Sequence, residues 1–169
     1  AEIERIGDRM KLVSFDTSLD ELQQKLKLDY LEIVDDENFD QALSEIVETA
    51  IKKSKGVGGT RLLQNQHLNK LDPGLANRTK IDIKFTPKAA PTSKKHLQKV
   101  MAKEYALPIL DENGEVKKIV YGGRIINRDY ELVDRIRKLA FGRDLYDGKP
   151  VGTVTIFQDD TRISTNVLN

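Results

Sequence analysis

Two apolar runs separated by a four-residue turn are the feature that most restricts how this chain can fold. The runs cover residues 105–110 and 115–126, and the turn between them reads Asp-Glu-Asn-Gly. Asn113-Gly114 marks a β-hairpin because both residues accept a positive φ at little steric cost. Pro108 cannot donate a ladder hydrogen bond, so we expect its strand to lie at an edge at that point or to carry a bulge.

Hydrophobic periodicity predicts further elements on both sides of this hairpin. Asp72-Pro73-Gly74 predicts a turn, and the Pro- and Lys-rich segment 87–95 predicts a loop. A helix through residues 42–51 is expected to end at the glycine-rich segment 56–59. Strands are expected at residues 28–35, 60–64, 80–85, 151–157 and 162–167.

A second helix is expected after residue 126. Asn127 is suited to cap it, and Gly142 is placed to end it. Asp129 and Glu131 would lie in its first turn, where carboxylates suit the helix dipole. The spacing predicts a buried face made of Leu132, Val133, Ile136, Leu139 and Ala140.

The N-terminal region carries a helical pattern. An apolar stripe extends through Ile3, Ile6, Met10 and Val13, and residues 18–21 form a capping box before Leu19, Leu22 and Leu26. Two helices or one long bent helix satisfy this pattern equally. The stripe fits either an ordinary core-packing helix or a helix that pairs with a partner chain and continues from a membrane span.

Composition excludes several classes of function. The chain has 169 residues, with 28 Lys and Arg against 27 Asp and Glu, which argues against a dedicated nucleic-acid binder. It has no Cys and only two histidines, His67 and His96, so thiolate chemistry and multi-histidine metal sites are not expected. His67 and His96 are predicted to be solvated in polar loops. No apolar stretch approaches the roughly 20 residues that span a bilayer.

Two long motifs resemble a known family. Residues 120–136 read VYGGRIINRDYELVDRI, and residues 152–167 read GTVTIFQDDTRISTNV. They are similar to the two signature motifs of Cache sensor domains, the extracytoplasmic PAS-like modules of prokaryotic histidine kinases and chemoreceptors. The chain departs from the family after residue 36, where a second strand is usual but a helix follows almost directly.

The resemblance implies an α+β fold. A long N-terminal helix would lead into a five-stranded PAS-like antiparallel sheet with flanking helices. The implied organisation is an N-terminal signalling helix region at 1–27, a ligand-sensing lobe at 28–142, and the start of an incomplete, membrane-proximal second lobe at 143–169.

The implied function is sensing of a small extracellular solute, an anionic organic acid being the expected class. The parent would be a membrane-anchored receptor that forms a homodimer through the N-terminal helix, first a histidine kinase and alternatively a methyl-accepting chemoreceptor. We expect neither catalysis nor a cofactor in this chain, and the missing C-x-x-C-H motif excludes covalent haem. A ligand-free dimerising spacer and an intracellular PAS-like or hydrolytic enzyme are the competing hypotheses.

The predicted ligand site lies on the central strands. Tyr105, Tyr121 and Arg124 would line the floor of the sensor pocket, with Lys84 as a further cationic candidate. Arg124 offers a planar fork for a carboxylate or phosphate, or is a solvated charge at the edge. Gly122-Gly123 could form a bulge, allow a close helix crossing, or open one wall of a cavity.

Overall fold

The computed structural model describes residues 18–41, 44–84 and 92–167 and has an α+β fold built on a four-stranded antiparallel sheet. The predicted N-terminal stripe through Ile3, Ile6, Met10 and Val13 lies outside these residues, and the described chain begins with the short helix α2. The element bounds are α2 (Leu19–Leu26), β1 (Tyr30–Asp35), η1 (Asp36–Gln41), α3 (Glu45–Lys53), β2 (Val57–Gln64), α4 (Asn65–Leu71), α5 (Leu75–Arg78), β3 (Lys99–Leu110), β4 (Val116–Ile125), α6 (Tyr130–Phe141), β5 (Leu145–Tyr146), β6 (Lys149–Pro150), β7 (Thr155–Gln158) and β8 (Thr161–Thr165).

The predicted central hairpin is confirmed as β3 and β4, in a sheet with strand order β1-β4-β3-β2. Its turn depends on Asp111, whose Oδ1 accepts hydrogen bonds of 2.9 Å from the amides of Asn113 and Glu115. Gly114 has a positive φ of 82°, whereas Asn113 does not have a positive φ. The pairing of β2 with β3 ends at Ala106, so Pro108 lies where one edge of β3 is open, as predicted.

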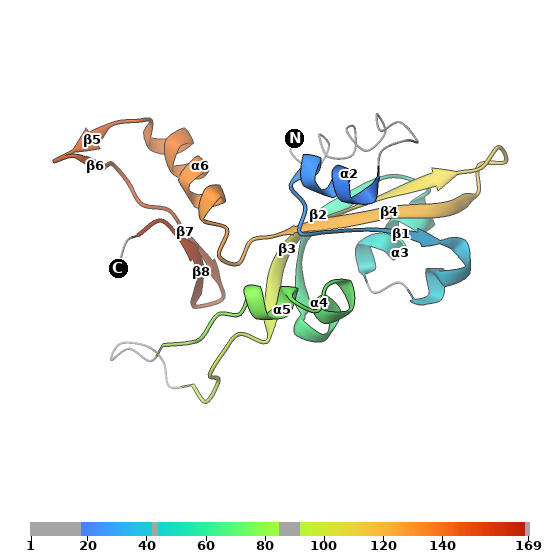
Figure 1. Cartoon of the computed structure of the whole chain (residues 1–169), viewed down its shortest axis with the longest axis horizontal. Helices are drawn as coiled ribbons and strands as arrows, with labels where there is room; N and C mark the ends of the chain where they lie inside the picture. Colours follow the sequence, from blue (N-terminus) through green and yellow to red (C-terminus); the bar gives the residue numbers. More distant parts are fainter. Residues whose placement is uncertain (1–17, 42–43, 85–91, 168–169) are drawn as a thin grey trace.

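Helices cover both faces of this sheet (Figure 1). On one face, α2 buries Leu22 and Leu26 against residues of β1 and β3. On the other face, α3, α4 and α5 pack over the main core, in which Leu68, Leu75 and Ile119 are fully excluded from water. The sheet is therefore buried on both sides over much of its length.

The caps of the first two described helices show which local signals were correct. Ser18 caps α2 by accepting a hydrogen bond from the amide of Glu21, which confirms the predicted helix start and one of the two hydrogen bonds of the capping box. Leu19 is 40% exposed and does not join the core. Ser54, with a φ of 46°, ends α3 before the glycines. Segment 57–59 is part of β2, so its prediction as a helix end is wrong.

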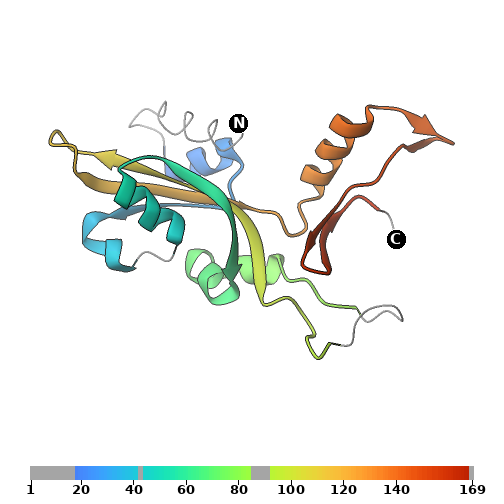
Figure 2. The same cartoon turned by 180° about the vertical axis from the view of Figure 1, so that it is seen from behind.

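The segment between α5 and β3 is less regular than predicted. Residues 80–84 make a single bridge, between Asp82 and His96, in place of the expected strand. Residues 85–91, which include much of the predicted loop, lie outside the described chain. The two extended segments on either side of this bridge run away from the sheet in Figures 1 and 2.

α6 and the small hairpins stand beyond one end of the sheet (Figure 2). Asp129, not Asn127, is the N-cap of α6, because its carboxylate accepts from the amide of Leu132. Asn127 instead accepts a 2.9 Å hydrogen bond from the amide of Met101, which ties the start of this unit to β3. Gly142 ends the helix with a φ of 69°, as predicted.

The predicted buried face of α6 is correct only in its first half. Leu132 and Val133 are buried, and Leu132 packs with Ile126 and Ile163. Ile136 and Ala140 are exposed, and Leu139 is 82% exposed. The reason is coverage, since the β7–β8 hairpin reaches the first turns of α6 and not its end. The division at residue 143 into two lobes stays a prediction.

Candidate functional site

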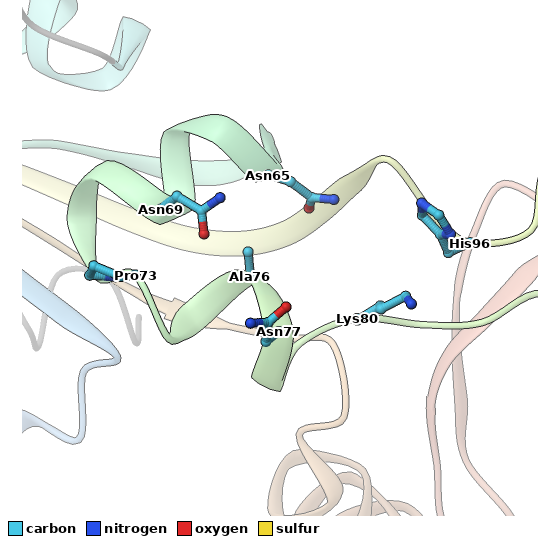
Figure 3. A pocket seen from close by; sticks show the side chains of 7 residues that line it. All are labelled: Asn65, Asn69, Pro73, Ala76, Asn77, Lys80 and His96. Atoms are coloured by element: carbon cyan, nitrogen blue, oxygen red, sulfur yellow. The ribbon is translucent and has the colours of Figure 1, made fainter.

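An open hollow lies between α4, α5 and the two extended segments beside them (Figure 3). It has a volume of about 540 Å³ and is lined by Asn65, Asn69, Pro73, Ala76, Asn77, Lys80 and His96. Figure 3 shows the asparagines on the helical side and Lys80 and His96 toward the other end. We call it the α4–α5 hollow.

Local sequence explains how this hollow forms. α4 begins directly at the end of β2, and the predicted Asp72-Pro73-Gly74 turn reverses the chain into α5. The amide of Gly74 donates to Asp72 Oδ1 at 2.8 Å, which closes the turn. Leu68 and Leu75, both fully buried, anchor the two short helices on the sheet. Asn65 and Asn69, four residues apart, then share one face of α4 at the hollow.

The lining of the α4–α5 hollow suits a small polar anion. It offers three side-chain amides, an ammonium group and an imidazole, and it contains no carboxylate. Lys80 forms an ion pair with Asp82, whose Oδ1 lies 3.4 Å from Lys80 Nζ. Both partners of that ion pair are about half exposed or more, so the pair is screened by water and Lys80 can turn toward a ligand.

The structure brings three of the predicted ligand residues together, but around very little space. Tyr105, Gly122 and Arg124 line a hollow of only about 30 Å³ on the α2 face of the sheet. That volume is on the order of one or two water molecules. Lys84 is exposed in the arm that follows α5 and lines neither this hollow nor the α4–α5 hollow.

Tyr121 and Gly123 point to the opposite face of the sheet. The register of β4 against β1 and β3 is regular through the glycines, so the bulge that could have turned Tyr121 and Arg124 to one side is absent. The Tyr30 ring occupies the position that a Gly123 side chain would take. If Gly122 carried a side chain, its Cβ would lie only 2.9 Å from Leu31 Cδ1 and from the Tyr30 carbonyl oxygen. The two glycines therefore let Tyr30 and Leu31 pack closely against β4, and the space that their missing side chains leave is filled.

A buried polar cluster lies where that face meets α3. Glu104 is 1% exposed and accepts hydrogen bonds from the hydroxyls of Tyr30 at 2.7 Å and Ser44 at 3.2 Å, and also from the Tyr121 hydroxyl. Burial, together with the negative charge of Glu104, raises the pKa of Tyr121 well above its ordinary value. Both tyrosines therefore stay neutral and donate to the carboxylate.

His67 extends this cluster and corrects a prediction. It lies on α4, not in a loop, and its Nε2 atom is buried without a hydrogen-bond partner among the described residues. Burial lowers the pKa of His67, and the nearby charge of Glu104 partly opposes that effect. His96, also predicted to be solvated, is half-buried and lines the α4–α5 hollow.

Sequence reasoning missed Glu104, although its parity gave a signal. Glu104 falls between Ala102 and Ala106 on the inward face of β3, and both alanines are fully buried. A carboxylate at an inward strand position requires donors. Two tyrosines at inward positions of β1 and β4 were therefore the partners to look for.

Arg124 is neither an open anion receptor nor an unpaired edge charge. Its Nε and Nη2 atoms donate to the two carboxylate oxygens of Asp129 at 2.9 and 3.0 Å, and Nη2 lies 3.3 Å from Glu131. Partial burial alone would lower the pKa of Arg124, but these acids raise it. Its fork is engaged in holding the start of α6.

Comparison with known proteins does not assign this chain to a family. No family model matches the chain, and no curated protein matches it. Within the described ranges there is no group of three or more His, Asp or Glu side chains that could hold a metal ion. None of the helices seen there is both long and apolar enough to cross a membrane.

Proposed function

We propose that this chain is a PAS-like, extracytoplasmic sensing module of a membrane-anchored receptor, and that it binds a small anionic solute in the α4–α5 hollow. The observation that carries the proposal is the lining of that hollow, which combines amides, Lys80 and His96 and has no carboxylate. A histidine kinase is the proposed parent, with a chemoreceptor as the alternative, and the N-terminal region 1–27 is the proposed dimer contact.

The fold is compatible with this role. A curved antiparallel sheet with helices on both faces is the architecture that the resemblance implies, although the described residues form four strands in the main sheet and not five. We place the solute at α4 and α5 because the glycine-bearing strand leaves only a water-sized space beside Tyr105 and Arg124.

The chemistry of the hollow favours a carboxylate that also carries polar groups. Lys80 supplies a compact positive charge, and the asparagine amides can both donate and accept hydrogen bonds. Figure 3 places Lys80 and His96 toward one end and the amides of Asn65 and Asn69 toward the helical side. A hydroxy acid or an amino acid would present a carboxylate to the first group and hydroxyl or amide groups to the second.

A response requires that the solute favour one arrangement of the domain over another. α4 is suited to transmit such a preference, because its outer face lines the hollow while Leu68 is buried in the core and the half-buried His67 lies close enough to be affected by the charge of Glu104. A shift of α4 would therefore change the packing under the sheet.

A thermal-shift screen of organic acids and amino acids tests the proposal. A true ligand at 100 times its Kd stabilises the protein by about 2.7 kcal/mol, so the Tm of the wild type should rise. Lys80→Gln should weaken the effect and Asn69→Asp should abolish it. Lys84→Gln, a nearby exposed lysine outside the hollow, is the matched control and should leave it unchanged.

The opposite result has a defined meaning. If no compound raises the Tm, the ligand-free spacer replaces the sensing proposal. If a compound raises the Tm equally in the wild type, Lys80→Gln and Asn69→Asp, the solute binds elsewhere and the α4–α5 hollow is not the site.

A further inference from the structure

A third hollow lies at the junction between the end of the sheet and the start of α6. Its volume is about 280 Å³. Its lining includes four cationic side chains and two carboxylates: Lys27, Arg78, Arg124, Arg128, Asp29 and Asp129. We call it the junction hollow, and it is separate from the α4–α5 hollow.

The two carboxylates are already engaged by the protein. Asp29 Oδ2 accepts a 2.7 Å hydrogen bond from the amide of Ile125, and its Oδ1 lies 3.3 Å from Arg78. Asp129 accepts both donors of Arg124 and also caps α6. Glu131 in addition pairs with Lys27 and with Arg124, so the four cations face three carboxylates and the junction hollow keeps an excess of one positive charge.

Among the four cations of the junction hollow, Arg128 is the one whose guanidinium is most available to bind an anion. No described residue forms an ion pair with its guanidinium, and its side chain is exposed at the hollow. Its backbone is held at a φ of 60°, which is uncommon for a residue with a side chain. The amide of Arg128 donates to the carbonyl of Ile163 at 2.8 Å, and this bond keeps the residue in that conformation.

The neighbouring residue adds an unused donor. Asn127 is 5% exposed and also lines the junction hollow. Its Oδ1 accepts from the amide of Met101, while its Nδ2 is buried without a hydrogen-bond partner. Buried donors are normally satisfied, so an unpaired amide beside a concave cationic surface is consistent with a missing acceptor.

We propose that the junction hollow binds a small oxyanion of the phosphate type, held between the guanidinium groups of Arg78 and Arg128. Guanidinium forks match tetrahedral oxyanions through charge-assisted hydrogen bonds. The bound anion would bridge α5 of the sheet body to the loop that precedes α6, so it would stabilise the junction of the two regions. The rim is exposed, so the anion competes with water and binding is weak.

Thermal shift with sodium phosphate, against sodium chloride at equal ionic strength, tests this site. Phosphate should raise the Tm of the wild type in a saturable manner, and chloride should not. Arg128→Gly removes the guanidinium at a φ that glycine adopts readily, so its anion-free Tm should not fall. Its affinity for phosphate should fall about tenfold or more, since one charge-assisted hydrogen bond is worth at least that factor.

Three further variants make the result decisive. Arg128→Lys should recover part of the affinity, and Arg78→Gln should lose affinity as Arg128→Gly does. Lys80→Gln, in the α4–α5 hollow, should leave the phosphate effect intact, and this separates the junction site from the proposed solute site. Equal effects of phosphate and chloride, or an unchanged phosphate effect in Arg128→Gly, would overturn the proposal.

Discussion

The sheet body and the C-terminal unit differ in how completely their apolar residues are covered. In the body, which comprises β1–β4 with α2 to α5, helices lie on both faces and Leu68, Leu75 and Ile119 are fully buried. In the unit made of α6 and β5–β8, a small cluster around Leu132 and Ile163 is buried, while Leu139 and Tyr146 are each 82% exposed. Helices of both regions, such as α3 and α6, carry apolar residues at helical spacing.

The difference shows that an amphipathic pattern is necessary for burial but not sufficient. A helix gains stability from its apolar face only where another element covers that face. α3 meets the sheet along its length and buries Ile46, Val47 and Ala50. α6 meets a two-stranded hairpin that is shorter than the helix, so its last turn stays in water.

The largest effect expected from this comparison is on global stability. Ile119→Ala should lower the free energy of unfolding by about 2–5 kcal/mol, because it leaves a cavity in the body core. Leu139→Ala makes a comparable truncation at an exposed site of α6 and should change it by no more than about 0.5 kcal/mol. Urea denaturation of both variants measures the difference, and equal losses would show that the end of α6 is covered in solution.

A smaller effect is expected from the glycines of the body. Gly123→Ala should destabilise the protein by about 1–3 kcal/mol, because the added methyl group meets the Tyr30 ring. Gly59→Ala in β2 is the matched control, since its new Cβ meets only Ile46 Cδ1, at 3.4 Å. That change should be neutral or slightly stabilising. A stable Gly123→Ala variant would mean that Tyr30 moves aside and that a hollow can open there.

The smallest effect expected is a pH dependence that belongs to the body. The folded pKa of His67 lies below its ordinary value of 6.5, so the unfolded chain binds the proton more readily. Stability from the neutral imidazole is therefore present above about pH 6.5 and is lost as the pH falls toward the folded pKa. Urea denaturation at about pH 7.5 and pH 5.5 should show a steeper loss for the wild type than for His67→Gln.

Parallel losses in the two proteins would contradict that assignment. Both histidines of the chain, His67 and His96, precede α6, so the C-terminal unit has no histidine of its own. His96→Gln is the matched control and should retain the steep loss, because the cause is the burial of His67.

Several local features were predictable because neighbouring residues determine them. The β3–β4 hairpin, the Ser18 cap, the Asp72-Pro73-Gly74 turn and the end of α6 at Gly142 all follow from backbone chemistry within a few residues. The cap of α6 was assigned to Asn127 instead of Asp129. Both residues can cap a helix, and only the tertiary contact of Asn127 with Met101 distinguishes them.

The candidate site was less predictable than the fold. Arg124 was correctly placed on a central strand, but its pairing with Asp129 depends on where α6 starts. The α4–α5 hollow unites residues from 65 to 96, and no periodicity links Asn69 to His96 across that distance. Glu104 directly precedes the predicted apolar run at 105–110, and its donors come from β1, β4 and the cap of α3.

By itself, the sequence determined the central hairpin, the main turns and several helix ends, because those choices depend on φ preferences, caps and side-chain periodicity within a few residues. It did not determine that residues 65–71 coil as α4 or that residues 80–84 form only a single bridge. The tertiary structure alone decided which apolar faces lose their water and which charges find partners. Desolvation and ion pairing depend on distance in space, and residues as far apart as Asp29 and Arg78 contribute to one site only after the sheet has brought them together.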